Sequence, residues 1–257
     1  MSEERGGIAI LETSTGIATP LVSAFWGAWA PDSQQIAFGL ASSGPPNVYT
    51  VSIRSGSERV RLTNSPNSQT VLDWSPDGRF IVYAEQPNDV KSVTKPGIWV
   101  LPLGDRTPFL FVETAYGPTN AQFSPDGHWI AYTATESGPV EVHVQSFPPG
   151  RGKWRVSAKG GNFPRWRGDG AELLYVAPDQ MLMSAGVQWI GERIQFGEPQ
   201  PLFRLSFAPR SEAKPYDVAS DGRILGFSTI PDSRAEGLVV LSNWDAELRV
   251  QGGTRRP

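Results

Sequence analysis

A ten-residue motif that recurs five times along the chain sets narrow limits on the possible fold. Its clearest copy runs from Trp74 to Tyr83 and reads Trp-Ser-Pro-Asp-Gly-Arg-Phe-Ile-Val-Tyr. Proline, aspartate and glycine in this order predict a tight turn, because proline fixes φ, aspartate bonds the nearby backbone and glycine accepts a positive φ. The apolar run that follows predicts a strand covered on both faces. The motif therefore predicts a strand, a turn and a second strand.

The copies are spaced 43 to 52 residues apart, measured between their aspartates. An aromatic or apolar residue stands three positions before each aspartate, an aliphatic residue four after it and an aromatic residue six after it. The five aspartates are Asp32, Asp77, Asp126, Asp169 and Asp221. A period near 45 residues in an all-β sequence is typical of propeller blades with four strands each.

We therefore expect an all-β propeller that forms a single domain over residues 1–257. The predicted four-stranded blades span 24–63, 70–112, 118–157, 162–204 and 214–250. Residues 8–22 match the third and fourth strands of later repeats, so they predict a two-stranded partial blade in a six-position ring. We expect the missing inner strands to belong to a longer parent protein, and the incomplete blade could pair with a second copy in a homodimer.

The overall composition favours some classes of function over others. The chain has 257 residues, of which 23 are basic and 26 acidic, and this balance gives no support to nucleic-acid binding. There is no cysteine, which excludes thiolate metal sites and thiol catalysis. The first residues are polar and no run of about 18 apolar residues occurs, so we expect neither a signal peptide nor direct membrane insertion. These features leave the compartment open, and a parent protein could be extracytoplasmic.

The third copy carries a family resemblance. Residues 123–132 read Phe-Ser-Pro-Asp-Gly-His-Trp-Ile-Ala-Tyr, which resembles the Pro-Asp repeats of TolB-type β-propellers. Residues 135–167 and the closing stretch 239–248 also resemble the C-terminal propellers of bacterial serine/threonine protein kinases. That resemblance implies a sensor or scaffold module that binds a protein or peptide. The sequence itself contains no kinase motif.

Few residues suggest catalysis. His128 and His143 are the only histidines; we interpret the first as a turn residue and the second as a packing residue. We interpret the five aspartates as turn formers, because each occupies the same place in a different repeat. There is no G-x-S-x-G motif for a serine nucleophile. We predict no cofactor, and the balance of these observations is against an enzyme.

One column of residues could take part in recognition. The residue before the aromatic position should lie on the innermost strand, facing the central channel. Loop-entry positions upstream add to this set, and the candidate binding residues are Trp26, Asp73, Asn120, Gln122, Asn162, Arg165 and Asp217. Their polar side chains could satisfy one another or bind a polar ligand. The preferred function is a non-enzymatic scaffold or sensor. The alternative is a propeller enzyme or a metal- or ligand-binding propeller with its site in the channel.

Overall fold

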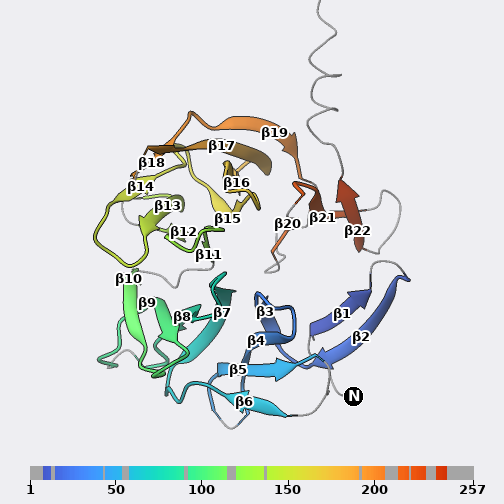
Figure 1. Ribbon diagram of the computed structural model, residues 1–257, viewed down its shortest axis with the longest axis vertical. Coiled ribbons are helices and arrows are strands. Elements are labelled where there is room, and N and C mark those ends of the chain that lie inside the picture. The colour runs from blue at the N-terminus through green and yellow to red at the C-terminus, as the bar shows by residue number, and fades with distance from the viewer. Residues whose placement is uncertain are drawn as a thin grey trace, which may run out of the picture. The chain divides into compact units, whose positions relative to one another are not determined.

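The described part of the chain consists of strands and turns, and its paired strands run antiparallel (Figure 1). The computed structural model describes residues 8–12, 15–42, 44–53, 58–89, 92–114, 120–135, 138–190, 193–205, 214–219, 221–229 and 236–241. The chain divides into two compact units. Unit 1 comprises 1–123 with 134–136, and unit 2 comprises 124–133 with 137–257. No described segment forms a helix with the length and hydropathy needed to cross a membrane.

Unit 1 contains a hairpin, two four-stranded sheets and one further strand. The hairpin pairs β1 (Ile8–Glu12) with β2 (Ile17–Val22). The first sheet has the order β3 (Phe25–Trp29), β4 (Gln35–Leu40), β5 (Asn47–Ser52) and β6 (Arg59–Arg61). The second has the order β7 (Ser68–Trp74), β8 (Phe80–Gln86), β9 (Gly97–Pro102) and β10 (Phe109–Glu113). The further strand is β11 (Ala121–Phe123).

Unit 2 contains the remaining strands. β12 (Trp129–Ala134), β13 (Glu141–Ser146) and β14 (Lys153–Arg155) follow one another in the sequence and in the third sheet. The fourth sheet is formed by β15 (Asn162–Trp166), β16 (Glu172–Val176), β17 (Met181–Ile190), β18 (Arg193–Phe196) and β19 (Gln200–Arg204). The last has the order β20 (Tyr216–Val218), β21 (Ile224–Thr229) and β22 (Glu236–Leu241).

The five repeated aspartates adopt the predicted turn role. In each copy a carboxylate oxygen accepts the backbone N–H of the residue two positions later, over distances of 2.9 to 3.1 Å. Asp77 also accepts the Ser75 hydroxyl at 2.6 Å, and Gly78 takes a φ of 74°. The turn is closed by a backbone bond from Gly78 N–H to the Ser75 carbonyl. The interpretation of these residues as turn formers is confirmed.

The fourth and fifth repeats differ from the simple expectation. Four strands are predicted over 162–204, whereas the structure has five, because β17 runs on past Ala185 and pairs with the additional strand β18. In the fifth repeat β20 to β22 are described, and the predicted fourth strand ending at residue 250 lies outside the described residues. The blade count, the single domain and the mode of ring closure stay predictions.

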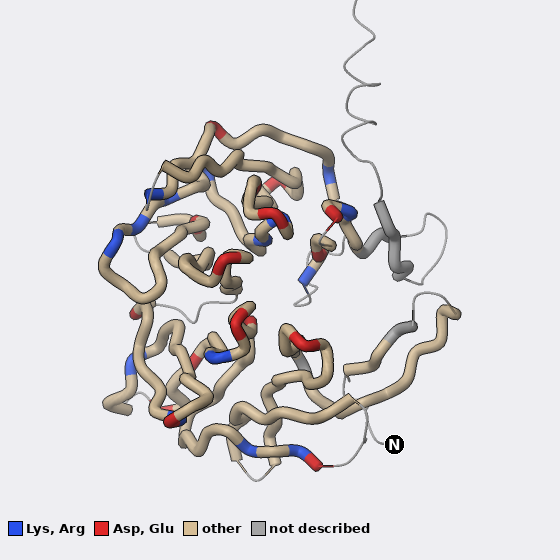
Figure 2. The backbone as a smooth tube through the Cα atoms, in the orientation of Figure 1, with Lys and Arg blue, Asp and Glu red and all other residues tan. Residues whose placement is uncertain are grey.

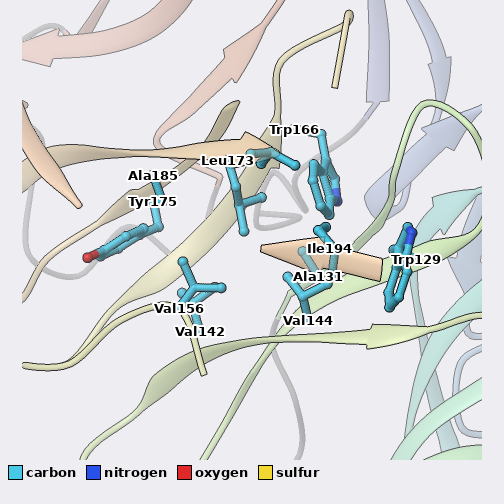
Figure 3. Close-up of a cluster of buried hydrophobic side chains, with 11 residues drawn as sticks. Trp129, Ala131, Val142, Val144, Val156, Trp166, Leu173, Tyr175, Ala185 and Ile194 are labelled. Atoms are coloured by element: carbon cyan, nitrogen blue, oxygen red, sulfur yellow. The ribbon is translucent and has the colours of Figure 1, made fainter. Parts of the chain in front are cut away.

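The apolar runs form the core, as their patterns predict. In unit 2 a large cluster joins the third and fourth sheets through Trp129, Trp166 and Leu173 (Figure 3). In unit 1 a second cluster joins the first and second sheets through Val48, Ile81 and Tyr83. Both faces of β8 and β12 are covered, because Phe80–Gln86 and Trp129–Ala134 hold almost continuously buried residues. Packing between successive sheets therefore stabilises each unit.

Candidate functional site

The candidate residues of unit 1 lie on, or directly before, the first strands of their repeats. Asp73 on β7 accepts the backbone N–H of Phe123 on β11 at 2.8 Å, which joins the ends of two strands from successive repeats. Trp26 on β3 has a φ of 60° and sits where the register between β3 and β4 shifts. Asn120 is 1% exposed directly before β11, and Gln122 on that strand is half-buried.

In unit 2 the structure brings two candidate residues together. Arg165 on β15 is 3% exposed, and its Nε lies 3.5 Å from Oδ1 of Asp217 on β20. The Arg165 guanidinium also donates to the Pro164 carbonyl at 2.8 Å. Asn162 Oδ1 accepts the backbone N–H of Phe163 at 2.8 Å, where the chain takes a φ of 55°.

The Tyr216 hydroxyl completes this arrangement by donating to the Phe163 carbonyl at 2.8 Å. Burial raises the pKa of Tyr216, so its hydroxyl stays a neutral donor over the ordinary pH range. Asp73, Arg165 and Asp217 are thus all engaged with groups of a neighbouring repeat. These contacts fit the alternative in which the polar side chains of the candidate binding residues satisfy one another. Ligand binding by these residues stays a prediction. Basic and acidic residues both occur at scattered places along the described chain (Figure 2).

Within the described ranges, no three or more His, Cys, Asp or Glu side chains gather in a way that could hold a metal ion. His143 is 7% exposed and stacks on Tyr132 with ring centroids 5.7 Å apart, in agreement with its predicted packing role. His128 lies exposed in its turn, also as predicted.

Sequence reasoning did not find a pocket of about 530 Å³ in unit 2, here called the methionine pocket. Its lining consists of Ala158, Lys159, Gly160, Tyr175, Ala177, Pro178, Asp179, Met181, Met183, Glu198, Pro199 and Pro201. The thioethers and the prolines supply apolar surface, and exposed charged residues stand at its edge.

One wall of the methionine pocket depends on glycine. A Cβ on Gly161 would lie 2.8 Å from Cδ2 of Tyr175, so a larger residue would displace the tyrosine ring. Burial and the nearby Glu141 carboxylate raise the pKa of Tyr175 to about 12. The Tyr175 side chain that bounds the pocket is therefore a neutral phenol, and its ring packs closely against the backbone at Gly161. Its residues come from the segment between β14 and β15, from β16 and the turn after it, from β17, and from β19 and the segment before it. No single motif of the sequence marks this combination.

Unit 1 has a groove of about 590 Å³ between its two four-stranded sheets, here called the turn groove. Its lining consists of Ala30, Pro31, Asp32, Gln35, Thr50, Val60, Leu62, Trp74, Asp77, Gly78, Leu103 and Arg106. The turns of the first two repeats form one side of it, and Val60, 44% exposed, lies on the edge strand β6. The repeat pattern locates these turns, but it does not reveal that a hollow lies between them.

Comparison with solved structures decides the fold. The chain superposes on TolB from Acinetobacter baumannii with a TM-score of 0.71 and 18% identity, over 93% of this chain and 57% of that one. The fold is a TolB-like β-propeller. An oligogalacturonate lyase from Vibrio parahaemolyticus shares it with a TM-score of 0.59 and 11% identity, over 93% of this chain and 72% of the lyase. The TolB-like fold thus occurs in proteins of different activity.

Sequence comparison finds distant similarity for this TolB-like chain. No family model matches it. A curated protein from Agrobacterium fabrum, described as uncharacterised, is 24% identical over 187 residues, which cover 67% of this chain and 62% of the relative. The chain therefore spans less than two thirds of the length of that relative and of the Acinetobacter TolB. The predicted propeller fold is confirmed, and the predicted link to a kinase stays a prediction.

Proposed function

We propose that this TolB-like propeller is a non-enzymatic scaffold or sensor module that binds a protein or peptide partner. The observation that carries the proposal is the methionine pocket of unit 2. Its volume of about 530 Å³ is in the range of sites that take a side chain or a short peptide segment. Methionine thioethers adapt to varied apolar partners, which suits recognition of a protein segment.

The charged residues at the pocket edge support a peptide ligand. Lys159, Asp179 and Glu198 are exposed and can meet the polar backbone or charged side chains beside a bound apolar group. An apolar floor with a polar rim is the usual composition of a protein-binding site. We expect a ligand to place one apolar side chain against Met181 and Met183.

The alternative of an enzyme or metal-binding propeller has less support. Its predicted carboxylates are Asp73 and Asp217, and each is already engaged, the first with a backbone N–H and the second with Arg165. A catalytic carboxylate should face a substrate rather than a structural partner. The alternative predicts turnover of a generic ester, lactone, phosphate or peptide substrate that is lost in Asp73→Ala or Asp217→Ala. We expect no turnover.

The test is selection of ligands from a phage-displayed random peptide library on the full chain, with affinities measured by titration. Ala158 is exposed and lines the methionine pocket, so Ala158→Trp should block it without removing core contacts. Ala219 is an exposed alanine in the same unit and outside the pocket, so Ala219→Trp is the matched control.

Selected peptides should bind the wild type and Ala219→Trp equally, and Ala158→Trp at least about tenfold more weakly, a loss of about 1.4 kcal/mol. Failure to enrich any peptide, or equal binding by both variants, would contradict the proposal.

A further inference from the structure

The fourth repeat has an insertion that shows what can cover the surface between two sheets. The third strands of the second and fourth repeats end in the same way: Leu103 N–H donates to the Arg79 carbonyl and Val187 N–H to the Ala171 carbonyl, each at 2.8 Å. Strand β9 then stops at Pro102, whereas β17 continues to Ile190 and pairs with β18. The hairpin formed by residues 187–196 is therefore an addition to the common repeat.

This hairpin covers the third and fourth sheets with apolar side chains. Ile194 is 3% exposed and packs in the cluster that contains Trp129 and Trp166 (Figure 3). Trp189 is itself 41% exposed; its ring centroid lies 6.4 Å from that of Trp129, and a Cβ on the turn residue Gly170 would be 3.7 Å from its ring. The hairpin thus seats an indole beside a repeat turn and above a neighbouring sheet.

The turn groove of unit 1 is the equivalent place in the first and second repeats, and it has no such hairpin. Gln35 stands three residues after Asp32, at the position that Trp129 occupies after Asp126. Val60 is paired with Thr50 in β5, as Trp154 is paired with Val144 in β13. The tryptophans that stand three positions before the turn aspartates differ in exposure. Trp166 in unit 2 is 4% exposed, whereas its counterpart Trp74 in unit 1 is half-buried.

We propose that the turn groove binds a partner segment that presents an indole side chain next to a basic residue, in the manner in which Trp189 is seated in unit 2. An indole has the size and flat shape to cover Val60, Leu62 and Trp74, which line the groove. This site is separate from the methionine pocket and does not depend on it.

The charges of the groove determine which residue of the partner should stand next to the indole. The lining contains two carboxylates, Asp32 and Asp77, and one guanidinium, Arg106. Asp77 is paired with Arg79 at 2.6 Å. Among the described residues Asp32 forms no ion pair, and its Oδ1 accepts only the backbone N–H of Gln34, at 2.9 Å. Asp32 is exposed, so a lysine or arginine of the partner can pair with it.

The test uses a short peptide as the probe: acetyl-Gln-Trp-Ile-Gly-Lys-amide with a fluorinated tryptophan, titrated against the full chain by fluorine NMR. We expect a dissociation constant of about 0.1 to 1 mM, the range for one buried aromatic group with little preorganisation. Val60→Trp fills the groove from its own edge strand and should weaken binding at least about tenfold. Val93→Trp is the matched control, because Val93 is 99% exposed in the same unit and lies outside the groove.

Two further variants keep the test decisive. Gln35→Trp fills the groove from the other side and should weaken binding as Val60→Trp does, in case one of them folds poorly. Asp32→Asn should weaken the lysine peptide about threefold at low salt and leave unchanged a peptide with glutamine in place of lysine.

The proposal is overturned if the wild type binds no probe up to about 10 mM, a limit far weaker than a specific contact would give. It is equally overturned if Val60→Trp and Val93→Trp bind alike. Loss of probe binding in Ala158→Trp alone would assign the probe to the methionine pocket and reject the turn groove. Conversely, loss in Val60→Trp with phage-selected peptides unaffected would separate this site from the proposed function.

Discussion

A buried carboxylate in unit 1 should be one of the most sensitive single positions of the described chain. Glu85 on β8 is 5% exposed. Its Oε1 accepts the Ser65 hydroxyl and the Asn67 side-chain amide, both at 2.9 Å, and its Oε2 accepts the Gln69 amide at 2.7 Å. Asn67 and Gln69 are each 2% exposed. The carboxylate therefore fixes the segment that connects the first sheet to the second, and the start of β7, to strand β8.

Replacing Glu85 by alanine removes the acceptor for all three donors. Water has little access to the amides of Asn67 and Gln69, so each loses a hydrogen bond without compensation. An unsatisfied buried donor costs about 1–3 kcal/mol, which gives a total loss of about 3–5 kcal/mol in the free energy of unfolding. Glu85→Gln keeps the shape and one acceptor oxygen, so its loss should be about half as large.

The measurement is urea-induced unfolding followed by tryptophan fluorescence, with the midpoint and slope compared between variants. The control is Glu113→Ala in the same unit. Glu113 is 55% exposed in an ion pair with Lys95 at 2.6 Å, and such surface pairs contribute at most about 1 kcal/mol. If Glu85→Ala unfolds within about 1 kcal/mol of Glu113→Ala, the network does not hold the two sheets together.

Three further predictions concern stability. Trp166→Ala should cost about 3–5 kcal/mol and Trp29→Ala less than about 1.5 kcal/mol, because the first side chain is 4% exposed and the second 48%; similar losses in thermal or urea unfolding would refute this packing order. Asp77→Ala should cost about 1 kcal/mol through the lost turn bonds and leave binding of phage-selected peptides to the methionine pocket intact, which the same unfolding assay and a titration of those peptides check together. Tyr175 has a folded pKa of about 12 against an unfolded value of 10.0, so the unfolded state releases its proton first as the pH rises. The unfolding free energy should therefore fall between pH 10 and about 12, and Tyr175→Phe should reduce that slope in unfolding measured across this window.

The turns and the buried strands could be predicted because their causes are local. Pro-Asp-Gly determines a turn through φ preferences and one side-chain bond, and all five aspartates make that bond. The repeat pattern also places Arg165 and Asp217 on the first strands of their repeats, β15 and β20. Their contact at 3.5 Å depends on the spacing of two sheets, which a repeat pattern alone does not give.

The extension of β17 could not be predicted because a local cue opposed it. Gly186 suggests the end of a strand, since glycine has no side chain to pack. In the structure a Cβ at Gly186 would meet nothing within 4 Å, and its carbonyl accepts the Gly197 N–H at 2.8 Å. The glycine thus stands where the strand leaves the packed sheet and enters the hairpin. The reason for the continuation is tertiary: Val187 and Ile194 of the hairpin pack in the cluster that contains Trp129 and Trp166.

Differences between the repeats are a better guide to recognition than the features that the repeats share. The shared columns specify turns and buried faces, and their groups are satisfied within the chain. The same structural place is occupied in unit 2 by the buried Ile194 and the partly exposed Trp189, and it is left as a groove of about 590 Å³ in unit 1, where Gln35 and Val60 replace larger aromatic residues. Keeping apolar surface such as Val60 in water has a cost in free energy, and covering it recovers about 25 cal/mol for each Å² removed from water. A partner that supplies the missing indole would gain this energy in unit 1, whereas in unit 2 the hairpin already occupies the equivalent place, so the difference between the two places would give the groove its specificity.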